Sequence, residues 1–143
     1  MQETFFTSKE ASKITGCTLR QLQYWREKGV VVPVISDTGT GRSIYYSKTN
    51  LVELAAMVYW LSVGLSFDIA CETLKMLKDQ EPELFSSGKG KRFMLLSEAQ
   101  ERSLELMEYD RTKAIASLDE GKPVIPIWLD VIYQQLRQKL EKN

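Results

Sequence analysis

The chain has 143 residues, with 19 Lys/Arg, 19 Asp/Glu and no histidine, so its formal net charge at pH 7 is zero. A hydrophobic content of 43% and a charged content of 27% are those of an ordinary globular protein. The longest apolar run, AAMVYWLSVGL, is too short to cross a bilayer, and we expect neither a membrane span nor a secretory signal. The two cysteines, Cys17 and Cys71, indicate no disulfide framework, so the cytoplasm is the expected compartment.

The distribution of charge points to the first third of the chain. Residues 1–50 contain seven Lys/Arg and four Asp/Glu, a balance of +3, so residues 51–143 carry −3. This asymmetry fits an anion-facing surface in the N-terminal third. The lack of histidine also removes the commonest general acid or base and the commonest nitrogen ligand of metals.

Two short helices are predicted first, separated by a tight turn. In TSKEASKITG, Thr7 and Glu10 have the spacing of a capping box, and Gly16 is placed to end the helix. TLRQLQYWREKG repeats this pattern, because Thr18 and Gln21 form a second capping box and a glycine again follows. Two helices joined by so short a turn form a helix-turn-helix.

A small hairpin and two more helices are predicted next. VVVPVIS is interrupted by Pro33, which suits an edge strand, and SIYYS follows beyond the loop DTGTGR. Asn50 and Glu53 have cap spacing for an almost wholly apolar helix, LVELAAMVYWLSV, which Gly64 ends. Ser66 is the expected cap of a fourth helix. The residues expected on its buried side are Ile69, Thr73, Leu74 and Leu77.

The segment KDQEPELFSSGKGKR is polar and rich in Pro, Gly and Ser, which predicts a linker. We therefore divide the chain into a first domain at 1–78, a linker at 79–92 and a small α/β tail at 93–143. In the tail RFMLL, LELMEYD and VIPIWL are predicted strands, and RTKAIASLDEG and VIYQQLRQKLEKN are predicted helices. About fifty residues form a marginal fold alone, so the tail is expected to pack on a neighbour or on a second copy.

The last helix carries an apolar stripe whose role is open. Its members recur at helical spacing: Leu129, Ile132, Leu136 and Leu140. The stripe either packs on the strands of the tail itself or forms part of a dimer contact, and the sequence favours neither.

The second helix has an apolar side and a polar side. Leu19, Leu22 and Trp25 are expected to face inward. The other sides hold polar residues: Arg20, Gln21, Gln23 and Tyr24. A helix that enters the major groove needs bidentate polar side chains for base edges, and cations or hydroxyls for phosphates. The polar side meets this need, but a merely solvated helix has the same pattern.

The order of these segments resembles the DNA-binding domain of the MerR family of bacterial transcription regulators, over residues 5 to about 77. The residues that carry the resemblance are the Thr-Gly-Cys-Thr-Leu-Arg turn, Tyr24-Trp25, Lys28-Gly29, the wing GRSIYYS and the break Gly64-Leu65-Ser66. Each of these motifs alone is a weak indicator of the family, but their order and spacing together are fairly specific. The resemblance implies a winged helix-turn-helix that binds double-stranded DNA.

The resemblance also implies roles for single residues. Thr18, Arg20 and Tyr24 would meet DNA from the second helix, and Arg42 and Tyr46 of the wing would lie near phosphates. Two positions depart from the family pattern. Where relatives often have an arginine before the aromatic pair and an acid after it, this chain has Gln23 and Arg26. Gln23 still suits an adenine edge, so the base specificity is expected to be the chain's own.

Metal, redox and enzymatic roles are not favoured. There is no Cys-x-x-Cys, and both thiols fit buried structural positions. The carboxylates of the tail fit the solvated face of an amphipathic stretch, and no nucleophile elbow or phosphate-binding glycine loop is present. We expect no enzyme activity, no cofactor and no metal.

The prediction is therefore a mainly α chain, with a MerR-like winged helix-turn-helix followed by a small α/β C-terminal domain. Its expected function is sequence-specific DNA binding as a transcription regulator, acting as a dimer on a promoter. Pro82 interrupts the long coiled-coil helix through which many relatives dimerise, so the tail is the expected means. The expected partners are double-stranded DNA and a second copy, with RNA polymerase a further candidate. An excisionase-like architectural factor that bends DNA and a protein-interaction adaptor remain alternatives.

Overall fold

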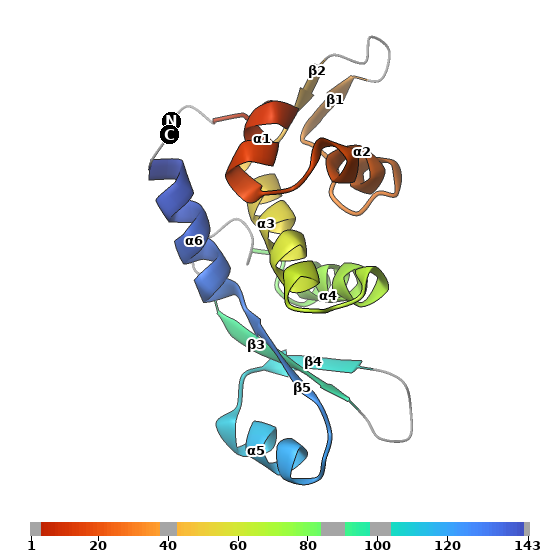
Figure 1. Ribbon diagram of the computed structural model, residues 1–143, viewed down its shortest axis with the longest axis vertical. Coiled ribbons are helices and arrows are strands. Elements are labelled where there is room, and N and C mark those ends of the chain that lie inside the picture. Colours follow the sequence, from red (N-terminus) through yellow and green to blue (C-terminus); the bar gives the residue numbers. More distant parts are fainter. Residues whose placement is uncertain (1–3, 38–42, 84–90, 98–103, 142–143) are drawn as a thin grey trace.

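The computed structural model describes residues 4–37, 43–83, 91–97 and 104–141 (Figure 1). The helices within these residues are α1 (Ser8–Thr15), α2 (Leu19–Glu27), α3 (Lys48–Ser62), α4 (Phe67–Gln80), α5 (Arg111–Asp119) and α6 (Leu129–Glu141). The strands are β1 (Ile35–Asp37), β2 (Ser43–Tyr45), β3 (Arg92–Ser97), β4 (Leu104–Glu108) and β5 (Val124–Trp128). Helices α1 to α4 and the β1–β2 hairpin gather at one end of the molecule, and the β3–β5 sheet and α5 form the other (Figure 1). The predicted fold class is confirmed.

The first helix begins and ends where the sequence predicts. The backbone N–H of Thr7 donates to Glu10 Oε1 at 2.9 Å, and the N–H of Glu10 donates to Thr7 Oγ1 at 3.2 Å. This reciprocal cap satisfies two of the backbone donors that a helix start leaves unpaired. Gly16 ends α1 with φ of +80°, a conformation that costs glycine little because it has no Cβ.

The cap of α3 lies three residues earlier than predicted. Ser47, and not Asn50, is the N-cap, and its hydroxyl accepts from the N–H of Asn50 at 3.1 Å. Asn50 fills the third position of this capping box, and its side chain returns a bond to the N–H of Ser47 at 3.0 Å. Serine and asparagine are about equally good N-cap residues, so residue type alone does not decide which of the two begins the helix.

Helix α3 runs through the middle of the fold and is buried on most sides, which explains its almost continuous apolar sequence. It packs against α1, α4 and α6. Trp60, Leu51, Leu54 and Met57 of α3 are fully buried.

Gly64 ends the segment with φ of +106°, and Ser66 then caps α4 through the N–H of Ile69, both as predicted. On α4, Thr73, Leu74 and Leu77 are buried, and Ile69 is half-buried.

The tail is a three-stranded antiparallel sheet in the order β4-β3-β5. β3 pairs Leu95 with Leu106 of β4 and with Ile125 of β5. Its successive residues Phe93, Met94 and Leu95 are all buried, so both faces of the central strand are covered. The three predicted strands and the two predicted helices of the tail are confirmed.

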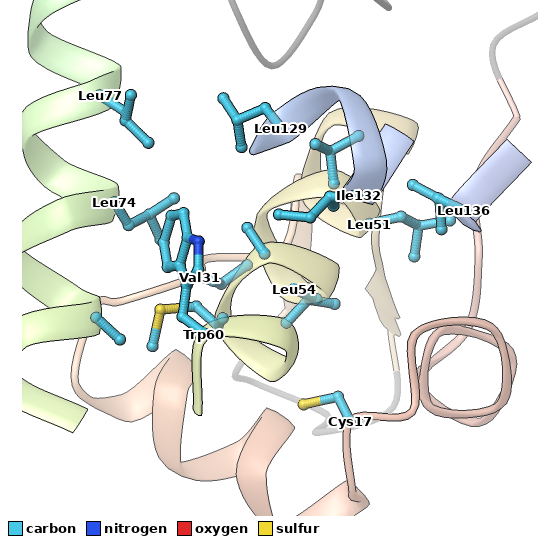
Figure 2. Packing of buried hydrophobic residues seen from close by; sticks show 14 of the residues in the cluster. Cys17, Val31, Leu51, Leu54, Trp60, Leu74, Leu77, Leu129, Ile132 and Leu136 are labelled. Atoms are coloured by element: carbon cyan, nitrogen blue, oxygen red, sulfur yellow. The ribbon is translucent and has the colours of Figure 1, made fainter. Parts of the chain in front are cut away.

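The apolar stripe of α6 packs in part on the tail's own sheet, as one interpretation of the sequence predicted, and also on helices that neither interpretation named. Leu129, Ile132 and Leu136 are buried, and α6 packs on α3 and α1 as well as on β3. Figure 2 shows Ile132 and Leu136 beside Leu51 of α3, with Leu129 between them and α4. The tail and the helix-turn-helix therefore share one hydrophobic core. The expected linker is described only in part, since α4 ends at Gln80 and β3 begins at Arg92.

Candidate nucleic-acid interface

Helix α2 is fixed at its start by a second reciprocal cap. The N–H of Gln21 donates to Thr18 Oγ1, and the N–H of Thr18 donates to Gln21 Oε1, both at 3.0 Å. Both residues were predicted to contact DNA. The cap occupies the Oε1 atom of Gln21 and leaves this side chain half-buried. Thr18 stays exposed at the helix N-terminus, where backbone N–H groups and the helix dipole favour an anion.

The inner side of α2 matches the prediction at two of three positions. Leu22 and Trp25 are each 2% exposed, whereas Leu19 is 51% exposed. The expectation that Leu19 faces inward is therefore wrong. The reason lies two residues earlier, because the fully buried Cys17 fills the core at this end of the helix. Leu19 is left at the rim, on the first turn of α2.

The outer side of α2 is a single row of polar side chains. Arg20, Gln23, Tyr24 and Glu27 are exposed and follow one another at spacings of three, one and three residues, so they share one helix face. This face points away from the one that buries Leu22. Glu27 was not among the predicted residues of this face, and its carboxylate accepts from Gln23 Nε2 at 3.2 Å. We name Arg20, Gln23, Tyr24 and Glu27 the outer row of α2.

Tyr24 is held in place from two directions although its side chain is 46% exposed. The ring of Phe67, the first residue of α4, lies 5.7 Å from the Tyr24 ring, and Lys28 Nζ lies 5.6 Å from its centroid. Phe67 also stacks on Trp25 at 6.4 Å. The contact with Phe67 joins residues more than forty positions apart, and no periodicity in either helix indicates it. It limits the rotation of the Tyr24 ring, and Lys28 adds a positive charge beside it.

Tyr46 does not lie where the resemblance implied. Its side chain is fully buried, and its backbone forms two 2.8 Å hydrogen bonds with Phe6. Burial raises the pKa of Tyr46, while the nearby charge of Arg26 lowers it to a smaller extent. Arg26 is half-buried and directed toward this tyrosine, so it is not part of the outer row. The expectation that Tyr46 meets a phosphate is corrected, since a side chain without exposed surface cannot reach a ligand.

The wing is described only at its base. β1 pairs with β2 in antiparallel register, with Ile35 opposite Tyr45. Arg42, the predicted phosphate contact, lies outside the described residues. Tyr45 is 38% exposed, unlike its buried neighbour Tyr46, and is the exposed aromatic of the second wing strand.

Asn50 fastens the base of the wing to the helices, a role that the sequence did not reveal. Its Oδ1 accepts from the N–H of Val34 at 3.1 Å, and its Nδ2 donates to the carbonyl of Val32 at 3.1 Å. Nδ2 also donates to Glu53 at 3.0 Å, and the buried Glu53 pairs with Lys78 Nζ at 2.6 Å. The segment that leads into β1 is thereby fixed to both α3 and α4.

The described residues hold no cluster of metal ligands, and of the two cysteines Cys17 is buried as predicted while Cys71 is only half-buried. Within the described ranges, no three His, Cys, Asp or Glu side chains gather closely enough to hold a metal ion. Cys17 is fully buried, and this burial raises the pKa of its thiol to about 12. The thiolate, which is the nucleophilic and metal-binding form, is therefore disfavoured. None of the described helices is both long and apolar enough to cross a membrane.

The family described as MerR HTH family regulatory protein matches residues 6–77, just over half of the chain. The chain belongs to the MerR family. The match ends within α4, so it covers the two helices of the motif, the wing and the α3–α4 pair, and leaves the tail outside. A search of curated proteins finds no match.

Membership of a DNA-binding regulatory family agrees with the geometry of α2. The matched segment contains the outer row, the Thr18 cap and Phe67. It also contains Asn50, which fixes the wing base. The unmatched tail contributes α6 to the shared core, so this MerR-family domain is completed by a helix that the family match does not include.

Proposed function

We propose that the chain regulates transcription by binding double-stranded DNA at promoters as a homodimer, with the outer row of α2 in the major groove. The observation that carries this proposal is the division of α2 into two opposite faces. Leu22 and Trp25 anchor one face in the core, and the other presents an arginine, a glutamine and a tyrosine to solvent. The Thr18 cap and the Phe67 contact keep that face in a fixed position.

Each exposed side chain has chemistry suited to a part of the duplex. Arg20 is a fork of donors that fits the O6 and N7 acceptors of guanine. Gln23 fits adenine once its amide turns away from Glu27. Thr18 and Tyr24 supply hydroxyls for phosphates, with Lys28 adding charge beside Tyr24. Arg42 is expected to add a phosphate contact from the wing.

Selection of genomic fragments by the purified protein tests this function. Palindromic sites near promoters support a dimeric regulator. Sites arranged as direct repeats support the excisionase-like architectural alternative. A failure to enrich any sequence, by a folded protein at low salt, supports the adaptor alternative. Affinity for a selected site is expected to fall steeply as salt rises, because phosphate contacts release counterions.

Substitution of Arg20 then tests the proposed surface. Arg20→Ala is expected to weaken binding to a selected site by about ten- to a hundredfold, the range for loss of one bidentate base contact. The matched control is Arg137→Ala, which removes an exposed arginine from α6. Equal affinities of the parent, Arg20→Ala and Tyr24→Ala would show that DNA binds elsewhere.

A further inference from the structure

Helix α5 is exposed on almost every side. Among its side chains Ala114 alone is buried, while Ile115 and Leu118 are 46% and 58% exposed. Residues three apart on a helix lie side by side, so these two form a continuous apolar pair on the surface. Tyr109, two residues before the helix, is also exposed. A nine-residue helix is marginal by itself, and α5 packs only lightly on β5, so a covering partner would stabilise it.

The charges of α5 are arranged against its own dipole. Arg111 and Lys113 lie in the first turn, and Asp119 and Glu120 lie at the C-terminal end. The partial charges of a helix favour acidic groups at the N-terminus and basic groups at the C-terminus. Apart from the N-cap Asp110, α5 has the reverse order. This arrangement weakens the helix slightly, so helix stability does not explain it.

An antiparallel second copy of the same helix resolves this conflict. Arg111, Ile115 and Asp119 are spaced by four residues and share one face. A two-fold axis beside Ile115 places Arg111 of each chain against Asp119 of the other, because 111 and 119 are equally far from 115. The same axis brings the apolar pairs together and aligns the two helix dipoles in opposite directions. Such a self-complementary patch is what a two-fold dimer requires.

We propose that α5 is the dimer contact of this protein, with Ile115 and Leu118 at its centre and reciprocal Arg111–Asp119 pairs at its edges. This inference rests on the homodimer of the proposed function and names the surface that forms it. Figure 1 shows α5 at the end of the molecule farthest from the hairpin and α2. Pairing through α5 therefore leaves the outer row of α2 uncovered in both copies.

Two charge-reversal variants test the α5 contact, because each is expected to weaken the dimer alone and the two together are expected to restore it. In Arg111→Glu the edge pairs of a homodimer become Glu–Asp, and in Asp119→Arg they become Arg–Arg, so each variant alone repels itself. An equimolar mixture forms heterodimers in which both edges are again Glu–Arg and Arg–Asp. We expect each single variant to raise the dimer Kd by about tenfold or more, and the mixture to restore the parent value. Sedimentation equilibrium measures all of these constants, and circular dichroism verifies that each variant is folded.

The apolar centre is tested by Ile115→Asp, with Val63→Asp as control because Val63 is 53% exposed on the turn after α3. Ile115→Asp is expected to yield a folded monomer, and Val63→Asp a dimer. A parent protein that is monomeric, or a dimer unaffected by both charge reversals and Ile115→Asp, overturns the α5 contact. A dimer that obeys the rescue but selects no DNA supports the α5 contact and overturns the proposed function. The two failures are thus distinguishable.

Discussion

Replacement of Asn50 by alanine is expected to loosen the wing and destabilise the whole domain. The substitution removes four hydrogen bonds, at 3.0 to 3.1 Å, from a side chain that is 8% exposed. Each such bond contributes about 1 kcal/mol net, and water can replace part of the loss at the partly buried N–H of Ser47. The free energy of unfolding is therefore expected to fall by about 2–4 kcal/mol. Urea denaturation followed by tryptophan fluorescence measures this difference.

Two further variants decide whether the bonds, and not the volume, of Asn50 matter. Lys48→Ala removes an exposed side chain from the same helical turn and is expected to change stability by about 0.5 kcal/mol or less. Asn50→Asp keeps the shape and both acceptor bonds, but it removes the donor and places a second carboxylate beside Glu53. It is expected to cost at least about 1 kcal/mol. An aspartate variant as stable as the parent would refute the assignment of the network.

Two other predictions concern the core. Ile132→Asp places a charge in the seam between α6 and α3, so the tail and the helix-turn-helix are expected to lose structure in one transition. That variant is expected to be destabilised by about 3 kcal/mol or more, with Gln134→Asp as the exposed control on the same helix. A helix-turn-helix that stays folded in Ile132→Asp, by circular dichroism and fluorescence, would contradict the shared core. For Cys17, whose pKa rises from 9.0 to about 12, the folded state holds the proton longer than the unfolded state does. Its contribution to stability is full below pH 9 and is lost as the pH rises toward 12. At pH 8.5 iodoacetamide is expected to label Cys17 only in denaturant. Labelling of Cys17 itself in the folded protein at the denatured rate would contradict its burial.

The local elements were predictable because their signals lie within a few residues. The capping boxes at Thr7 and Thr18 and the turn at Gly16 each depend on side chains that bond their own backbone. The inner face of α2 was predictable from Leu22 and Trp25, whose spacing reports burial directly. The prediction that Leu19 is buried failed because periodicity gives the direction of a side chain and not the position of the edge of the core.

The contacts between distant segments were not predictable from patterns. The side chain of Asn50 bonds the backbone of Val32 and Val34, and backbone groups leave no trace in the residue types. Phe67 meets Tyr24 only because α4 folds back onto the end of α2. Tyr46 shows the opposite error. Its type suits a phosphate contact, but the adjacent Tyr45 is the exposed one of the pair, and strand alternation cannot say which face is covered.

The position of α6 links the two proposals physically. Helix α6 leaves β5 directly and packs on α1 and α3, and α1 in turn packs on α2. A contact through α5 is therefore connected to the outer row of α2 by packed elements that share a core. If two copies pair through α5, the separation of their α2 helices is set by this packing and not by a linker. The two half-sites of the bound DNA are then expected to have one fixed spacing, and inserting five base pairs between them, half a helical turn, would place the second half-site on the opposite side of the duplex.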